Sequence, residues 1–311
     1  MDKAFLGVIW AFAFVFLESF QAVFFGGLFQ SLSPYLFGFL VFGITSLGFV
    51  GWTALKKPQH IKNALNNPRP LIAINIAATI AVMSYLVSIK LIEPAIAYCI
   101  SAGAMPITTY VLFRLGVREG EGMRNRFEAA GNALLFCGIV YLAGITITGS
   151  SGFVREGAWE IALIGVLLAV LDGVLFTWVL VYGQRLDKVG VGPDAVFGLR
   201  FMFYICAAGG LALTDPAPAG QYEFSELSML VLIGLLLTIP PLYALQRAIA
   251  LISTLTISAF TSLGPFIIFA LQMMEGRVEY STQTLIGLII YSAGAMIASI
   301  GAYKAATNGG N

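Results

Sequence analysis

The chain has 311 residues, of which 59% are hydrophobic and 11% charged, and its mean hydropathy is +0.88. This composition excludes an ordinary soluble domain and indicates a protein that crosses a membrane several times. The formal net charge of +1, without a basic tail, argues against a nucleic-acid partner.

The apolar runs are continuous rather than alternating, so each crossing is predicted to be a helix of roughly 20 residues. Ten segments meet this requirement, and their short connections leave no room for a soluble domain. In chain order they are residues 4–27, 34–55, 71–89, 94–115, 126–147, 158–183, 193–213, 226–245, 254–274 and 282–303. The first is too long for a signal-peptide core and lacks a following small-residue cleavage site, so we expect it to be retained.

One sequence pattern occurs twice. Pro106 and Pro265 each lie within a small-residue apolar run that ends in a cluster of Arg and Glu, and they are 159 residues apart. The same distance separates Pro34 from Pro193, which begin the second and seventh spans. Self-similarity at about half the chain length predicts that a unit of five helices was duplicated.

The basic residues predict the orientation of these units. Thirteen of the seventeen Lys and Arg residues fall on the side of the amino terminus: Lys3, Lys56, Lys57, Lys62, Arg69, Arg114, Arg118, Arg124, Arg126, Arg185, Lys188, Arg247 and Lys304. By the positive-inside rule, both termini are expected in the cytoplasm. Because each unit has an odd number of helices, residues 153–311 should enter the membrane upside down relative to residues 1–152.

The predicted fold is therefore an all-α membrane protein with ten transmembrane helices in two inverted five-helix repeats. Secondary transporters have this design, with the substrate site near the bilayer midplane between the repeats. We expect a multi-pass protein of the inner (cytoplasmic) membrane, as a monomer or a homodimer.

Each proline helix is followed by a short turn and a glycine-rich helix. The first copy reads LGVRE at residues 115–119, followed by EAAGNALLFCGIVYLAG; the second reads MEGR at residues 274–277, followed by LIGLIIYSAGAMIASIG. Over nearly the whole chain, this pattern resembles the EamA branch of the drug/metabolite transporter superfamily. The arginine often found seven residues after the second helix's proline is present as Arg200 but is Val41 in the first repeat. The resemblance implies a metabolite transporter and assigns no substrate.

Two carboxyl groups lie deep in apolar segments. Glu18 and Asp172 are each about 14 residues into their helix, roughly 21 Å along its axis. Charged groups at such depth are costly and usually face a cavity, where a carboxyl group can exchange a proton for a cation. We predict that both couple transport to protons and contact the solute. Alternatively, each is a protonated acid bonded to a neighbouring helix.

The other candidate substrate-binding residues are aromatic or amide side chains of helices expected to line the cavity: Trp10, Phe14, Gln21, Tyr85, Trp178, Tyr243 and Gln246. An acid among aromatic rings suits a cationic or amphipathic solute. For the tyrosines, a position at the lipid interface is the competing interpretation.

Several further side chains carry structural predictions. Arg200 should reach toward the cytoplasmic face or pair with an acid, for which Asp172 is one candidate. Pro240 and Pro241 should interrupt the eighth span. Asn75 and Asn132 should bond across helix contacts. We expect close helix packing at small residues, namely Gly131, Gly138, Gly287, Gly294 and Ala298. Cys99, Cys137 and Cys206 lie in apolar runs without metal-ligand spacing, so buried positions are expected.

These features predict a secondary transporter that moves a small organic solute by alternating access, driven by protons or by the solute gradient. Export of a cationic or amphipathic solute is the preferred reading. Uptake or exchange of a neutral or anionic metabolite, such as an amino acid, is the alternative. A membrane enzyme is disfavoured, because the sequence offers no nucleophile with a base, no metal cluster, no phosphate loop and a single histidine. The expected partners are the solute and the lipid bilayer, and no cofactor or metal is predicted.

Overall fold

The computed structural model describes residues 3–30, 32–120, 122–153, 159–214, 223–249, 251 and 260–308, and every regular element within them is a helix. In chain order these are α1 (Lys3–Leu28), α2 (Pro34–Lys56), α3 (Pro58–Asn66), α4 (Pro68–Leu91), α5 (Pro94–Arg114), α6 (Arg126–Ile147), α7 (Trp159–Lys188), α8 (Pro193–Leu199), α9 (Met202–Thr214), α10 (Phe224–Ile249), α12 (Gly264–Glu275) and α13 (Thr282–Asn308). Nine described segments are long and apolar enough to cross a membrane, with α8 and α9 forming one of them together. The chain is thus an all-α, multi-pass membrane protein.

The helix ends follow from local chemistry. Proline occupies the first turn of α2, α3, α4, α5, α8 and α12, where its missing N–H needs no intrahelical partner. Asn125 caps α6 by accepting a bond from the Glu128 N–H at 2.9 Å. Gly276 ends α12 in the left-handed conformation, with φ of 82°, which a residue without Cβ adopts at little cost.

The observed helices differ from the predicted spans in three places. The predicted span 193–213 opens at Arg200 and Phe201, which separates α8 from α9. Helix α10 runs unbroken through Pro240 and Pro241, so the predicted interruption is wrong. Helix α12 begins at Gly264, which puts Pro265 in its first turn rather than in mid-helix; the earlier part of that predicted span, residues 254–259, lies outside the described residues. Helix α3 was not predicted.

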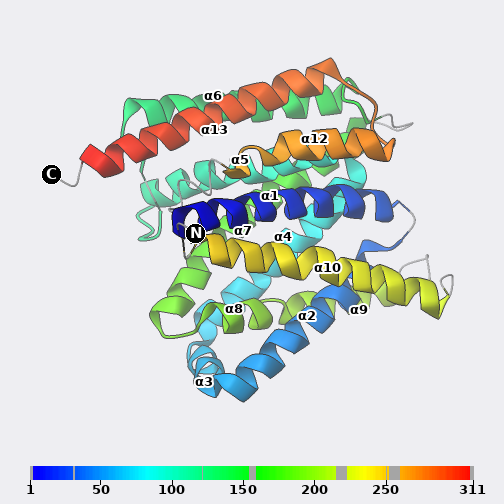
Figure 1. Cartoon of the computed structure of the whole chain (residues 1–311), viewed down its shortest axis with the longest axis vertical. Coiled ribbons are helices and arrows are strands. Elements are labelled where there is room, and N and C mark those ends of the chain that lie inside the picture. Colours follow the sequence, from blue (N-terminus) through cyan, green and yellow to red (C-terminus); the bar gives the residue numbers. More distant parts are fainter. Residues whose placement is uncertain are drawn as a thin grey trace.

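The helices lie side by side in a bundle (Figure 1). Helices α6 and α13 pair along one edge, while α2, α3 and α8 lie toward the opposite edge. Between these edges, α1 packs against α10 and α12, and α7 packs against α4 and α5. The start of α1 and the end of α13 lie at the same end of the bundle (Figure 1).

The α6–α13 pair confirms the predicted small-residue packing. A Cβ on Gly131 would meet the backbone of Ala298 and Gly294, and one on Gly138 would meet the Tyr291 backbone within 2.8 Å. A Cβ on Gly294 would in turn meet the Leu135 backbone. These glycines allow the two helix backbones to touch. In lipid, which is as apolar as the side chains, such close van der Waals packing is what stabilises a helix pair.

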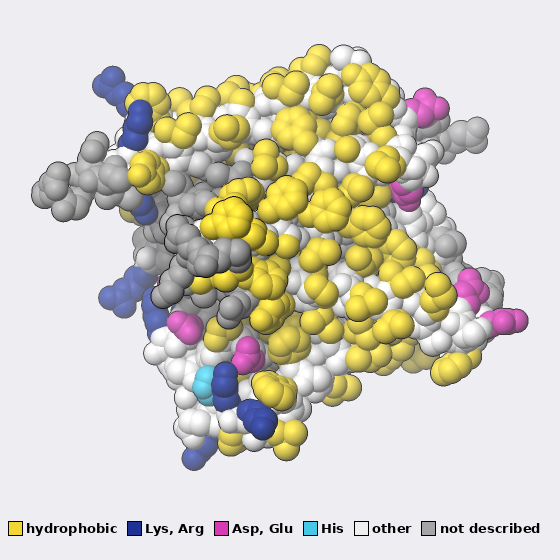
Figure 2. Space-filling view, in the orientation of Figure 1, with side chains coloured by type: hydrophobic (Ala, Val, Ile, Leu, Met, Phe, Trp, Pro, Cys, Tyr) yellow, Lys and Arg dark blue, Asp and Glu magenta, His cyan; other side chains and the backbone are white. Residues whose placement is uncertain are grey.

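The outer surface is largely apolar, as a lipid-facing surface requires. Figure 2 shows hydrophobic side chains spread across the middle of this face, with Lys and Arg at the end where α1 begins and most visible Asp and Glu at the other end. Leu47 of α2, for example, is 68% exposed. Cys137 and Cys206 are also exposed, and only Cys99 is buried, so the predicted burial holds for one of the three.

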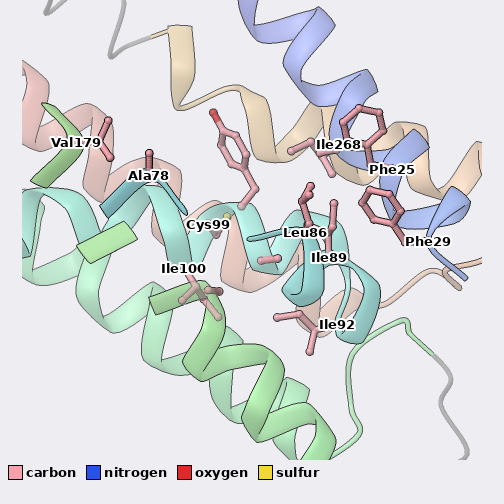
Figure 3. Close-up of a cluster of buried hydrophobic side chains, with 14 of the residues drawn as sticks. Phe25, Phe29, Ala78, Leu86, Ile89, Ile92, Cys99, Ile100, Val179 and Ile268 are labelled. Carbon is pink, nitrogen blue, oxygen red and sulfur yellow. The ribbon is translucent and has the colours of Figure 1, made fainter. Parts of the chain in front are cut away.

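The core is built from the inner faces of the spans. Part of it is drawn in Figure 3, where side chains from α1 and the turn after it, α4, α5, α7 and α12 gather: Phe25, Phe29, Ala78, Leu86, Ile89, Cys99, Ile100, Val179 and Ile268. All of these are buried. Burial of aliphatic and aromatic side chains on these faces leaves the few polar groups inside the bundle as exceptions that need a reason.

Candidate functional site

A cavity of about 140 Å³ lies inside the bundle, among α1, α2, α4, α7, α8 and α10. Its wall is mainly aromatic and aliphatic, with four polar side chains among them. The lining residues are Phe14, Glu18, Gln21, Phe42, Ala78, Ala81, Val82, Phe176, Val179, Phe197, Arg200, Phe201, Thr238 and Pro241. An apolar concavity with a few convergent polar groups is the usual form of a small-molecule site.

Glu18, in the middle of α1, lines this cavity next to Phe14 and Gln21, as predicted. Tyr98 of α5 donates a hydrogen bond to Glu18 Oε2 at 3.3 Å. The neighbouring Ser19 is buried and bonds both Val15 O in its own helix and Gly264 O at the start of α12. These contacts fix the turn of α1 that carries the acid.

Asp172 of α7 is buried and accepts a hydrogen bond from Ser101 of α5. Gly173 makes this possible, because a Cβ there would meet the Ser101 carbonyl and hold the two helices apart. Asp172 is absent from the described cavity wall. Tyr85 of α4 is partly buried against the hydrophobic core and is likewise absent from the described cavity wall.

Sequence reasoning missed the two α5 side chains that bond these acids. Tyr98 and Ser101 are three residues apart and therefore share a face of the helix. Two polar residues at this spacing in an apolar helix are a signal of a polar contact, which could have identified them. Through these two side chains, α5 contacts both acids inside the bundle.

Arg200 lies at the opening between α8 and α9 and contributes a cation to the cavity wall. Its guanidinium lies 4.8 Å from the Phe197 ring centroid and 4.7 Å from that of Phe201. No ion pair with Asp172 is present among the described residues, so the predicted pairing is wrong; the aspartate bonds Ser101 instead. Aromatic faces attract the guanidinium through their quadrupoles and substitute for a carboxylate partner.

Asn75 of α4 forms a cross-helix contact, as predicted. Its Nδ2 donates to Leu199 O at 2.9 Å, and its Oδ1 accepts from the Phe203 N–H at 3.2 Å. Asn132, in contrast, donates to Glu128 O one turn back in its own helix, so the predicted cross-helix bond is wrong there.

Helix α10 completes the polar part of the wall. Gln21 of α1 donates to Thr238 Oγ1 at 3.1 Å, and Pro241 lies one turn further along. Because Pro240 and Pro241 have no N–H, the carbonyls of Leu236 and Leu237 lose their helical donors although the helix continues. The double proline thus frees backbone acceptors in the preceding turn of α10 without breaking the helix.

The remaining predicted binding residues lie away from the described cavity wall. Trp10 packs edge-on against Tyr243, with centroids 5.6 Å apart, and Tyr243 is 56% exposed on the lipid-facing surface. Trp178 stacks on Tyr182, one turn along α7, while Phe176 on the same helix lines the cavity. The side chain of Gln246 lies outside the described residues.

The basic end of the bundle is closed by charged and polar contacts. Arg185, at the end of α7, binds Glu119 in the α5–α6 loop with two bonds, of 3.2 and 2.9 Å. This bidentate contact holds the pKa of Glu119 at about 2. The Gly192 N–H donates to His60 Nδ1 at 2.7 Å, which joins α3 to the loop before α8.

At the opposite end, Glu93 lies fully buried between α4 and α5. Gln272 of α12 donates to its Oε1, while Thr284 of α13, at 3.1 Å, and the Gly152 N–H, at 3.3 Å, donate to Oε2. Burial raises the pKa of Glu93 to about 7, although these donors and Arg277 act in the opposite direction. An acid just before Pro94 reads as a loop residue in the sequence, so nothing in the sequence pointed to this network.

Comparison with known proteins gives the fold alone. A solved structure described only as "Crystal structure of protein" is similar, with a TM-score of 0.61 at 18% sequence identity, over 94% of this chain and 96% of that chain. No family model matches the chain. No curated protein matches it either.

Proposed function

We propose that the protein is a secondary transporter of the EamA type, in the drug/metabolite transporter superfamily, that moves a small organic solute across the inner membrane by alternating access. One observation carries this proposal: Glu18, an acid deep in α1, lines an aromatic-walled cavity within a bundle of membrane-spanning helices. An ionisable group at this depth costs free energy in a membrane protein and usually marks a functional site.

The helix boundaries support the proposal that residues 1–152 and 153–311 are two inverted five-helix repeats. Pro34 begins α2 and Pro193 begins α8, at the spacing seen in the sequence. The cluster of Lys and Arg at the end where α1 begins supports a cytoplasmic location for that end (Figure 2). In this proposal the cavity lies between the repeats, where alternating access requires it.

For the solute, Glu18 and its phenylalanine neighbours favour a cationic or amphipathic molecule, exported in exchange for protons. Arg200 favours the second candidate, a solute that also carries an anionic group, such as an amino acid. A cavity wall that holds both an acid and a guanidinium can pair each end of such a molecule.

A binding screen tests the proposal. Thermal unfolding of the detergent-purified protein is measured at pH 6 and pH 8 with choline-like cations, polyamines, amino acids, sugars and nucleotides, for the wild type, Glu18→Gln, Arg200→Gln and Glu160→Gln. Glu160 is an exposed acid at the start of α7 and serves as the matched control. Solutes that raise the unfolding temperature are then tested for flux into liposomes with and without a pH gradient.

A cation that stabilises the wild type more strongly at pH 8, loses its effect in Glu18→Gln and keeps it in Glu160→Gln supports proton-coupled transport of cations. A hit abolished by both Glu18→Gln and Arg200→Gln supports the second candidate. Chemical conversion of the solute without flux would contradict transport of either kind.

A further inference from the structure

The helix that carries Arg200 is opened by side chains from its neighbours. In an uninterrupted α-helix, the Phe203 N–H would bond the Leu199 carbonyl. Here the Asn75 amide takes both partners, since it donates to Leu199 O at 2.9 Å and accepts from the Phe203 N–H at 3.2 Å. The preceding carbonyl, that of Gly198, accepts a bond from Ser46 of α2.

Asn75 is itself held firmly. It is 3% exposed, and its Nδ2 also donates to Leu71 O one turn back in α4, at 2.9 Å. The amide therefore has a fixed orientation, which sets the width of the opening in the facing helix. A side chain inserted into the hydrogen-bond ladder is one of the recognised causes of a helix break.

The two residues in the opening are the ones that matter for the cavity. Arg200 and Phe201 lie between α8 and α9, and both line the cavity. The Arg200 Nε is buried without a hydrogen-bond partner among the described residues. The direction of the guanidinium depends on the backbone from which it projects and on the rings of Phe197 and Phe201.

We infer that Asn75 is a positioning residue, which keeps the Arg200 guanidinium in the cavity by holding the helix open between Leu199 and Phe203. Without the amide, the Leu199 carbonyl and the Phe203 N–H are free to pair with each other, and closure of the ladder turns residue 200 to a different direction. The use of this cation in solute binding rests on the proposed function, whereas its placement by Asn75 does not.

The experiment measures the charge of the cavity directly. Val82 lines the cavity on α4, two turns from Asn75. A chain with Val82→Cys, in which Cys99, Cys137 and Cys206 are replaced by alanine, is reacted with two methanethiosulfonates of similar size, the anionic sulfonatoethyl and the cationic trimethylammonium-ethyl reagents. The ratio of the anionic to the cationic reaction rate reports the local potential, because a unit charge a few ångströms away changes each rate in opposite directions.

Arg200→Gln is expected to lower this ratio by about fivefold or more, as the cation is removed. Asn75→Leu, which keeps the branched shape but has no donor or acceptor, should lower it by a similar factor, and the double variant should show no further loss. Asn132→Leu is the matched control, since Asn132 bonds only within its own helix, and it should leave the ratio at the parent value.

A parental ratio in folded Asn75→Leu, alongside a lowered ratio in Arg200→Gln, would overturn the inference. Should Asn75→Leu not fold, Asn75→Ala and Asn75→Ser make a second pair: the alanine is expected to lose the ratio and the serine hydroxyl, which both donates and accepts, to restore part of it. Equal, parental ratios in these two variants would also overturn it. No solute is needed, so a failure here is distinct from a failure of the proposed transport.

Discussion

Two helix contacts in the bundle involve positions that differ by 159 residues from one contact to the other. One contact contains a continuous helix and the other an open helix. Helix α10 packs against α2, and α4 packs against α9. In the first contact Gly234 faces Val41, and α2 is continuous; in the second, Asn75 and Arg200 stand at the corresponding positions, and the helix is open. The difference teaches that an open helix, with a cation at the cavity wall, occurs where a neighbouring amide satisfies the backbone N–H and C=O groups that the opening exposes.

Exchanging the residues at the two positions is expected to have the largest effect. Val41 is fully buried in an intact helix, so Val41→Arg places a cation where no opening or carboxylate receives it, and we expect a loss of about 3–5 kcal/mol of stability. Arg200→Val removes a half-buried cation whose Nε lacks a hydrogen-bond partner among the described residues, and it should keep or raise the unfolding temperature. Both are measured by thermal unfolding in detergent. A well-folded Val41→Arg would contradict the comparison, because the intact contact would then tolerate an arginine that only the open contact is expected to accept.

The glycine of the intact contact gives the next largest effect. A Cβ on Gly234 would lie 2.5 Å from Phe37 Cζ and 2.7 Å from Val41 Cγ2, and Phe37 is buried. Gly234→Leu should therefore force α10 away from α2 at a cost of about 1–3 kcal/mol. Gly48→Leu on α2, where a Cβ meets nothing within 4 Å, is the control in the same denaturation assay. Equal stability of the two variants would mean that the contact is loosely packed.

These two contacts mark the limit of what could be predicted from the sequence. Apolar length and the positions of prolines suffice for most spans, because burial in lipid leaves the helix as the way to satisfy the backbone. The cavity position of Glu18 followed from its depth in an apolar run. The opening at Arg200 did not follow, because it depends on an amide 125 residues earlier in the chain. Glu93 is comparable, since its donors come from three other segments.

A pH titration separates the two contacts from the rest of the molecule, because none of the four positions compared is acidic. The raised pKa of Glu93, about 7, means that the folded state holds a proton that the unfolded chain releases near pH 4.5. Stability should therefore fall as the pH rises from about 4.5 through 7, by at most about 3 kcal/mol. Glu93→Gln should flatten this part of the profile, whereas Gly234→Leu should shift it without changing its slope.

The smallest expected effect is at the basic end. The pKa of Glu119 is lowered to about 2, so its ionised form stabilises the folded state above pH 4.5. This stabilisation is lost as the pH falls toward 2. Since Arg185 is 39% exposed, Glu119→Gln should cost less than about 1 kcal/mol at pH 7. Unfolding at pH 7 and pH 4, with the exposed Asp187→Asn as control, measures it; a loss as large as that of Gly234→Leu would contradict this ranking.

The glycine contacts between α6 and α13 limit how the protein can move. With the two backbones touching at Gly131, Gly138 and Gly294, no layer of side chains lies between the helices to slide or tilt. The pair should behave as one rigid unit. Neither helix contributes to the described cavity wall. In the proposed transport cycle, the movement that opens the cavity to either membrane face would therefore fall to the other helices.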